Sequence, residues 1–361
     1  MDERDEVVVG VVGAQQVLRA VRRRMRDLMY DSRHKRQALQ ILRNIEGANG
    51  RISRAELRKC DEYANSVLGD RRFAPWLYVY TAVAGRFKEG WIPDNYYGRV
   101  VVPKLNGKHG RISALKSLNF RLVSSPAFPD LLAYINGVFV DPAGRIVPPR
   151  QVEEILFADA ERVVFKLDSS RQGRGVHVIN RGSFDLAAVI KLGNGVFQKF
   201  VQQHPAFDEF VRSSVATLRI TTFMDDRGNV SVRACYLRLG LAGETHVQSR
   251  SAVRVPVDLR NGELYDVGYT ADWKMIDRHP SSGVPFRGKS VPQFEDCVTT
   301  VVSLHRKVPY VRCVGWDCTV DRNERVRVLE WNGGHNDIKF SEATQGPCFA
   351  DLGWENLWRD E

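Results

Sequence analysis

Two short stretches near the C-terminus, residues 314–320 (VGWDCTV) and 326–332 (VRVLEWN), decide the expected fold of this chain. Both are rich in β-branched and aromatic residues, and residues 321–324 (DRNE) between them are typical of a turn. We therefore expect an antiparallel hairpin with a four-residue turn. The pairs that follow from such a turn are Val320 with Arg325 and Asp317 with Val328.

Alternation along these strands brings polar side chains together. Because successive side chains point to opposite faces, Asp317, Glu330 and Asn332 are expected on one face of the hairpin. On the return strand, Val326 and Val328 are expected to point inward, and by the same alternation Glu330 and Asn332 are expected to point inward as well. Two carboxylates and an amide on an otherwise apolar face require a compensating cation.

Oxygen ligands in this number suit Mg²⁺, which usually takes one or two carboxylates and completes its shell with water and phosphate oxygens. The hairpin therefore has the outline of a nucleoside-triphosphate site. A hairpin whose polar residues are salt-bridged or face solvent is the alternative interpretation.

A glycine-containing loop lies upstream. Residues 163–167 and 175–179 read as strands, and the loop 168–175 (DSSRQGRG) between them holds two glycines, two serines and two arginines. Glycine lets backbone N–H groups approach an anion, and Lys166 just before the loop could reach phosphate oxygens. The alternative is a flexible turn. The loop is neither a Walker loop nor a dinucleotide fingerprint, since no helix directly follows the glycines.

A helix is expected over residues 183–192, followed by a strand over residues 196–201 and then about a hundred residues of further strands before the hairpin. In this order the chain resembles the ATP-grasp superfamily, and within it the sugar-transfer-associated ATP-grasp branch, over residues 96–349. The Glu-x-Asn of residues 330–332 follows Asp317 by 13 positions, which is the metal-binding pattern of the superfamily. The other motifs are Lys166 with the glycine loop, residues 198–201 (QKFV), 217–222 (TLRITT) and 236–240 (YLRLG).

The resemblance implies an α+β ATP-grasp fold, in which two α+β subdomains clamp ATP. It implies Mg²⁺ ligation by Asp317, Glu330 and Asn332. It implies phosphate contacts from Lys166 and the earlier Lys116, and a lid formed by Ser170, Gly173 and Gly175. It implies that the backbone of Lys199 and Val201, with Gln198 beside it, reads the adenine edge. It implies that Arg219 and Arg238 stabilise the transferring phosphoryl group or the acyl phosphate.

The chain departs from the family pattern at two places. Gln198 stands where an acidic residue is common, and Asp208 is the nearest candidate for the ribose. After Asn332 the chain reads GGHND, residues 333–337, instead of a proline-containing turn. The second departure concerns the acceptor substrate rather than ATP.

Composition is that of a soluble intracellular enzyme. The chain has 361 residues with 43% hydrophobic content, enough for two or three domains with cores of their own. We expect no secretory signal, no membrane span and a cytoplasmic location. The six cysteines lack a Cys-x-x-Cys spacing, so we expect free thiols. They are Cys60, Cys235, Cys297, Cys313, Cys318 and Cys348.

The net charge of +10 is concentrated near the N-terminus. Residues 19–43 hold nine Lys/Arg and two Asp, a net charge of +7, and apolar residues recur there at helical spacing. This pattern predicts a basic amphipathic helix, either with a solvated face or with an anionic partner such as a membrane leaflet, a glycan or a nucleic acid. No RNA-binding motif supports a nucleic acid. A capping box at Ser53–Glu56 predicts a second helix, and Pro75 begins a third.

We predict a helical N-terminal region over residues 1–95 and a first α/β segment over residues 96–162. A lid subdomain follows over residues 163–201, and the catalytic sheet occupies residues 202–361. Residues 265–292, rich in Gly, Pro and charge, are expected to form a loop over the acceptor site.

Two classes of function remain. The first is an ATP-dependent carboxylate–amine ligase that forms ADP through an acyl phosphate, joining, for example, an amino acid to a sugar acid in polysaccharide biosynthesis. Its substrates would be ATP, a carboxylate and an amine. The second is a regulatory or glycan-binding module that keeps the ATP fold without chemistry. The metal ligands and the lid lysine are all present, which favours the ligase. A phosphotransferase is a third interpretation.

Overall fold

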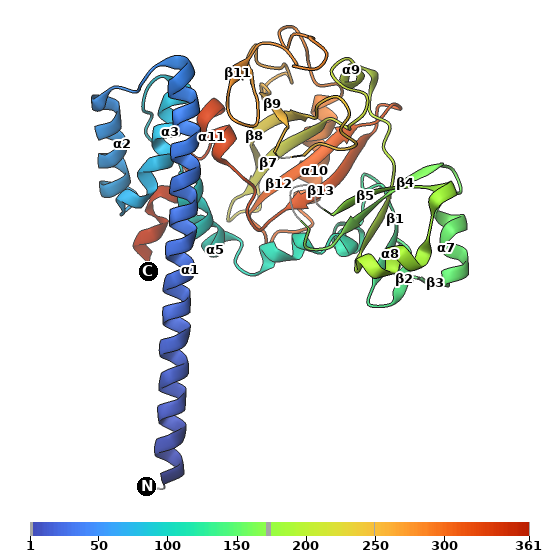
Figure 1. The fold of residues 1–361 in the computed structure, drawn as a ribbon, viewed down its shortest axis with the longest axis horizontal. Coiled ribbons are helices and arrows are strands. Elements are labelled where there is room, and N and C mark those ends of the chain that lie inside the picture. The colour runs from blue at the N-terminus through green and yellow to red at the C-terminus, as the bar shows by residue number, and fades with distance from the viewer. Residues whose placement is uncertain (1–2, 171–174, 249, 361) are drawn as a thin grey trace.

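A helical region and two antiparallel β-sheets lie side by side in the molecule (Figure 1). This computed structural model describes residues 3–170, 175–248 and 250–360. The expected α+β class with a helical N-terminal region is confirmed.

The first helix, α1 (Glu3–Asn49), is continuous over 47 residues, about 70 Å at 1.5 Å per residue. Its N-terminal part extends far beyond the rest of the molecule, whereas its C-terminal part packs against α3 (Ala74–Ala84) (Figure 1). The contact is apolar, with Ala38, Ile41 and Ile45 of α1 buried. The predicted basic helix is thus confirmed as a helix.

Local sequence signals determine where the next two helices begin. Ser53 Oγ accepts a 3.2 Å hydrogen bond from the Glu56 N–H and caps α2 (Arg54–Ser66), as expected. The carboxylate of Glu56 binds elsewhere, so only half of the capping box forms. Helix α3 begins one residue before Pro75.

The C-terminal residues return to the helical region. Helix α11 (Lys339–Gln345) packs against α3, and Phe349 and Trp354 are buried in the same apolar cluster as Trp76. The helical region is therefore built from both ends of the chain.

The smaller sheet has six strands in the order β3-β2-β1-β6-β4-β5. Helices α7 (Pro149–Leu156) and α8 (Leu186–Leu192) cover one of its faces. The strands are β1 (Asp130–Ile135), β2 (Val138–Val140), β3 (Ile146–Val147), β4 (Arg162–Leu167), β5 (Val176–Asn180) and β6 (Gly195–Lys199). The predicted boundary between residues 162 and 163 passes through this sheet, because β1 pairs with β6.

The larger sheet has seven strands in the order β11-β10-β9-β8-β7-β12-β13. Helix α10 (Phe294–His305) covers one face, which is largely apolar and mostly buried. The strands are β7 (Thr217–Met224), β8 (Val230–Leu239), β9 (Val253–Pro256), β10 (Gly268–Tyr269), β11 (Met275–Ile276), β12 (Cys313–Val320) and β13 (Val326–Asn332). We call the opposite face, which carries Asp317, the site face.

Short helices connect these units. They are α4 (Asp94–Tyr96), α5 (Val102–Leu105), α6 (Asn119–Val123) and α9 (Pro205–Asp208). All six cysteines are buried and unpaired, as expected. Among the described helices, none combines the length and the apolar character that crossing a bilayer requires.

Candidate nucleotide and metal site

The C-terminal hairpin, β12–β13, brings the three expected metal ligands to one face. Asp317 pairs directly with Glu330, and Gly315 pairs with Asn332. Because directly opposite residues of an antiparallel pair share a face, Asp317, Glu330 and Asn332 all lie on the site face. The other face of the hairpin packs on α10 and carries the stacked rings of Trp316 and Trp331, 6.1 Å apart.

The predicted pairing of the hairpin was wrong in detail. Val320 pairs with Val326, not with Arg325, and Cys318 pairs with Val328. The register then shifts between Cys318 and Asp317, which leaves Leu329 as an extra residue on β13. The turn is therefore one residue longer than expected, and a β-bulge follows it.

The bulge changes which side chains face inward. Val326 and Val328 pack in the apolar core beneath α10, whereas Glu330 lies on the opposite face with Asp317. Glu330 and Asn332 thus do not continue the inward series of the two valines, as the regular alternation predicted. One extra residue inverts the alternation, and without it the two carboxylates would lie on opposite faces.

Asp317 is bound by two arginines from neighbouring strands. Arg219 Nε and Nη2 lie 2.5 and 3.0 Å from its two carboxylate oxygens, and Arg238 Nη1 lies 3.2 Å from Oδ2. Burial alone would raise the pKa of Asp317, but the two guanidinium groups lower it to about 2. Arg219 also donates a 2.8 Å hydrogen bond to the Asn336 carbonyl. Asp317 is therefore a fixed, ionised carboxylate.

Glu330 has a different environment. Burial and the neighbouring Asp317 raise the pKa of Glu330, although Lys166 and Lys116 counteract this shift. A cation near both carboxylates would relieve their repulsion. Two carboxylates and the amide of Asn332 are hard oxygen donors in the number that Mg²⁺ uses beside phosphate oxygens. Within the described residues, no three His, Cys, Asp or Glu side chains form a metal-binding group.

Lys166 and Gln198 connect the two sheets at the bulge. Lys166 Nζ donates to the Leu329 carbonyl at 3.1 Å, and Gln198 Nε2 lies 3.4 Å from the same oxygen. Burial lowers the pKa of Lys166, while Glu330 and Asp130 counteract this shift. The small sheet therefore places the Lys166 ammonium group near the carboxylates of the large sheet, close enough for a charge interaction with Glu330.

Lys116 lies beside the glycine loop. Its Nζ donates to the carbonyls of Leu167 and Ser170, at 3.3 and 2.9 Å, and to Ser170 Oγ at 3.1 Å. The adjoining Ser117 binds both carboxylate oxygens of Asp168. The structure thus brings Lys116 and Ser170 together. Gly173 lies outside the described residues.

Gly175 closes the loop where no side chain fits. Its carbonyl accepts a 2.9 Å hydrogen bond from the Leu167 N–H. A Cβ at position 175 would lie 2.4 Å from Ser170 Cβ and 2.6 Å from Ser170 Oγ. Glycine is therefore required here by the close approach of Ser170.

The residues predicted to contact adenosine have different surroundings. The Lys199 N–H donates to the Pro129 carbonyl at 2.8 Å, so this N–H is already bound. Val201 is largely buried, 9% exposed. Asp208 accepts a 2.9 Å hydrogen bond from Gln203 and lies 3.6 Å from Arg322 in the hairpin turn. The turn is four residues beyond Asp317, about 13 Å along the strand, so Asp208 lies away from the carboxylates.

Sequence reasoning missed Asp130, which lies opposite Gln198 across β1 and β6. Gln198 Nε2 donates to Asp130 Oδ1 at 2.7 Å. Burial raises the pKa of Asp130 to about 6, although the bond from Gln198 counteracts this shift. A carboxylate from the neighbouring strand thus lies beside Gln198, the position at which the resemblance leads one to expect an acidic residue. Nothing local in the sequence indicates this pairing.

Sequence reasoning also missed Arg254. It pairs with Arg238 across β8 and β9, so Arg219, Arg238 and Arg254 form an arginine row on the site face. The guanidinium of Arg254 stacks over Trp273 and Phe340, and its Nη2 donates to two backbone carbonyls. Its Nε is buried and has no hydrogen-bond partner among the described residues.

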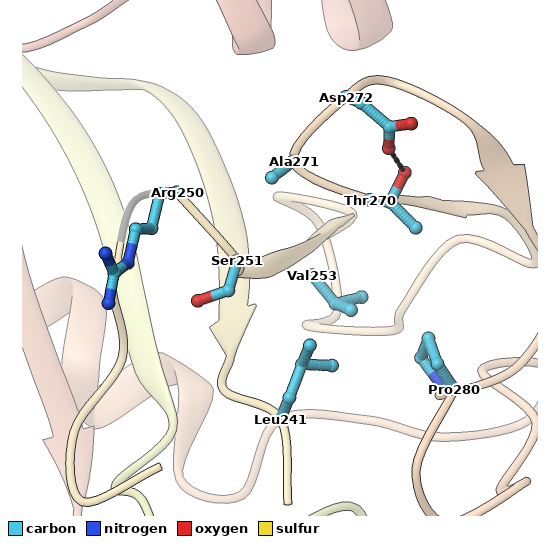
Figure 2. A pocket seen from close by; sticks show the side chains of 8 residues that line it. All are labelled: Leu241, Arg250, Ser251, Val253, Thr270, Ala271, Asp272 and Pro280. Carbon is cyan, nitrogen blue, oxygen red and sulfur yellow. Dashed lines mark hydrogen bonds between the residues drawn. The ribbon is translucent and has the colours of Figure 1, made fainter.

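A pocket of about 570 Å³ lies next to the arginine row. Thr270 and Ala271, whose carbonyls bind Arg254, belong to its lining. Figure 2 shows Arg250 on one side of the pocket and Pro280 on the opposite side. The full lining is Leu241, Arg250, Ser251, Val253, Thr270, Ala271, Asp272 and Pro280. Four residues of the segment 265–292 therefore belong to the lining of this pocket, and its role over an acceptor stays a prediction.

A comparison with known protein families gives one match. A family model described as sugar-transfer associated ATP-grasp matches residues 169–350, half of the chain. No curated protein matches the sequence.

Several solved structures show a partial similarity to this chain. The ATP-grasp ligase PsnB in complex with its minimal precursor has 12% identity and a TM-score of 0.40, over 71% of this chain and 64% of its own. Biotin carboxylase from Campylobacter jejuni has 11% identity and a TM-score of 0.43, over 89% and 68%. L-amino acid ligase from Bacillus licheniformis has 10% identity and a TM-score of 0.37, over 78% and 52%. This chain thus spans less than two thirds of the PsnB chain.

Proposed function

Because this chain belongs to the sugar-transfer associated ATP-grasp family, we propose that it is an ATP-dependent carboxylate–amine ligase that releases ADP. In this reaction an oxygen of the substrate carboxylate attacks the γ-phosphorus of ATP, and the bond from that phosphorus to the β-phosphate oxygen breaks. An amine then attacks the acyl carbon, phosphate leaves, and the amine loses a proton. The product is an amide.

The observation that carries this proposal is the composition of the site face. Asp317 and Glu330 lie directly opposite each other, two arginines bind Asp317, and Lys166 approaches from the other sheet. Cations arranged around two ionisable carboxylates match a metal-bound polyphosphate and an anionic acyl phosphate. Preorganised charges of this kind stabilise charge that develops in the transition state.

The predicted site residues within the described part of the chain would have distinct roles. Asp317, Glu330 and Asn332 would hold Mg²⁺, which when bound neutralises phosphate charge. Lys166, Lys116, Ser170 and Gly175 would contact the phosphates. The Lys199 carbonyl, Val201 and the Gln198–Asp130 pair would face the adenine, and Asp208 would serve the ribose.

Arg219 and Arg238 would act on the transferring group. Arg219 is fixed by Asp317 and the Asn336 carbonyl, so it is held in one position. Among the described residues Arg238 forms one ion pair, through Nη1 to Asp317, and its remaining N–H groups would bind the acyl phosphate. Guanidinium groups form charge-assisted hydrogen bonds of this kind with phosphate and carboxylate.

The acceptor would enter from the side of Arg254 and the neighbouring pocket. Arg238 and Arg254 are like charges directly opposite each other, an arrangement that an anion between them would stabilise. A carboxylate-bearing substrate, such as an amino acid or a sugar acid, has the required charge. We place the reaction in the cytoplasm, in agreement with the six unpaired thiols.

The decisive experiment measures phosphate release by the purified protein with ATP, Mg²⁺ and pairs of carboxylates and amines. Mass spectrometry identifies the product, and a mass equal to both substrates minus water is expected. Nucleotide binding without turnover for any pair would favour the regulatory or glycan-binding module. Phosphorylated carboxylate without amide would favour a phosphotransferase.

A further inference from the structure

Helix α1 has two faces with opposite surroundings. His34, Ala38, Ile41 and Ile45 are buried against the body of the protein. Val21, Met25, Leu28 and Met29, which we call the apolar stripe, are 50, 58, 61 and 69% exposed. Met25 and His34 are nine positions apart, which at about 100° per residue places them on opposite sides of the helix. The apolar stripe therefore points away from the body.

The acidic residues of α1 near this stripe face the body. Asp27 pairs with Arg99 at 3.3 Å, and Asp31 pairs with Arg99 and Arg72 at 2.9 and 3.2 Å. Their charges are thus neutralised by the domain itself.

The basic residues of α1 face outward instead. Within the described part of the chain, seven exposed basic side chains of α1 have no carboxylate partner. They are Arg22, Arg24, Arg26, Arg33, Lys35, Arg36 and Arg43. The outward surface of α1 is therefore cationic without internal compensation.

The basic side chains surround the apolar stripe. On the helical wheel Arg22 and Arg26 lie on one flank of Met25 and Arg24 lies on the other, at roughly 60–100° from it. Arg36 and Arg43 follow Met25 by about three and five full turns, so they lie on the same side of the helix. They line a depression of about 580 Å³ together with Arg33, Gln37, Leu39 and Gln40.

From these observations we propose that α1 docks this protein on an anionic lipid bilayer, a role separate from the ligase site. The apolar stripe enters the boundary between headgroups and acyl chains, and the flanking arginines bind lipid phosphates. Amphipathic helices with an apolar stripe and a basic flank bind bilayers in this way. A nucleic acid or a soluble glycan offers no apolar phase for Val21, Met25, Leu28 and Met29. A second copy of the same face would bring like charges together.

The test is flotation of the full-length protein with vesicles in 0.1 M salt. Vesicles of phosphatidylcholine with 30 mol% phosphatidylserine are compared with pure phosphatidylcholine. One variant replaces Arg22, Arg24, Arg26 and Arg36 with Gln, and a second replaces Met25 and Leu28 with Ser. A matched control replaces the exposed Arg54, Arg58, Arg86 and Arg150 with Gln, which changes the net charge equally.

We expect binding to the anionic vesicles only, a loss of at least tenfold in both α1 variants, and parent-like binding by the control. Raising the salt to 0.5 M should also release the protein, since exposed charges are screened. Absence of vesicle binding by the parent, or an equal loss in the control, overturns the proposal. If the parent dimerises without lipid and the variant with Ser at Met25 and Leu28 does not, the face binds a second copy of the chain instead. The proposal would likewise be overturned if the parent protein bound nucleic acid or an anionic glycan but did not bind vesicles.

Discussion

The ammonium group of Lys166 donates a 3.1 Å hydrogen bond to the carbonyl oxygen of Leu329, and this bond crosses from the small sheet to the large one. Leu329 is the bulged residue of the C-terminal hairpin. A bulge redirects the backbone locally, and here the same residue that turns Glu330 toward Asp317 also offers its carbonyl to Lys166. The contact therefore links the sheets at the position where we propose that phosphates bind.

Removing the lysine should weaken nucleotide binding. Lys166→Ala deletes the only cation that the small sheet places on the Leu329 carbonyl among the described residues. We expect the dissociation constant for ATP, measured by calorimetry, to rise by about tenfold or more, since a charge-assisted bond to phosphate is lost. Lys191→Ala, at an exposed position on α8, is the matched control. Equal affinities for the parent and Lys166→Ala would remove Lys166 from the phosphate site.

Neutralising Glu330 should stop turnover without unfolding the protein. Glu330→Gln keeps the shape of the side chain but removes one of the two paired carboxylates. We expect kcat to fall by at least about 100-fold, while thermal unfolding changes little because the Asp317–Glu330 repulsion is relieved. Glu324→Gln, in the turn of the same hairpin, serves as the control. Normal Mg²⁺-dependent ATP consumption by Glu330→Gln would contradict the metal assignment.

A side chain at position 175 should disturb the glycine loop. In Gly175→Val the new Cβ overlaps Ser170, so Ser170, which is hydrogen-bonded to Lys116, must shift. We expect ATP affinity to fall by roughly tenfold, as a rearranged loop presents its donors poorly. Gly182→Val is the matched control, because nothing lies within 4 Å of its added Cβ. If Gly175→Val binds ATP like the parent and the control, the loop is only a turn.

The nucleotide product distinguishes two modes of carboxylate activation. In our proposal the cations of the site face act on the terminal phosphate, so ATP should give ADP and phosphate. Chromatography of the products after partial turnover measures this directly. AMP and pyrophosphate as the main products would refute the acyl-phosphate route.

Stability should fall in mild acid because of His305. Its Nδ1 lies 2.7 Å from Thr222 Oγ1 and its Nε2 lies 2.8 Å from the Val311 carbonyl, beneath the C-terminal hairpin. Burial lowers the pKa of His305 to about 4, although the bond to Val311 counteracts this shift. The unfolded chain therefore binds a proton near pH 6.5, before the native protein does.

The contribution of His305 to stability is consequently complete above about pH 6.5 and is lost as the pH falls toward 4, at up to about 1.4 kcal/mol per pH unit for one histidine. Urea unfolding of the parent and of His305→Gln at pH 7.5 and 5.0 measures this loss. The variant should lose less stability than the parent between the two pH values. Equal losses would show that His305 does not contribute.

Much of the candidate site follows from sequence alone because its signals are local. The order of strands, the glycine loop and the Asp…Glu-x-Asn spacing require only neighbouring residues to be read. The Ser53 cap also depends on residues within one turn. These features predicted the α+β class, the hairpin and the placement of Asp317, Glu330 and Asn332 on one face.

Other features depend on contacts between distant strands. The bulge at Leu329 arises from how β13 pairs with β12, and regular alternation therefore assigned Glu330 to the side of the valines. Asp130 lies beside Gln198, and Arg254 beside Arg238, only because β1 pairs with β6 and β9 pairs with β8. Strand register is set by packing of whole faces rather than by local propensity. For this protein the sequence by itself determined which chemical groups are available, and the tertiary structure decided which of them meet.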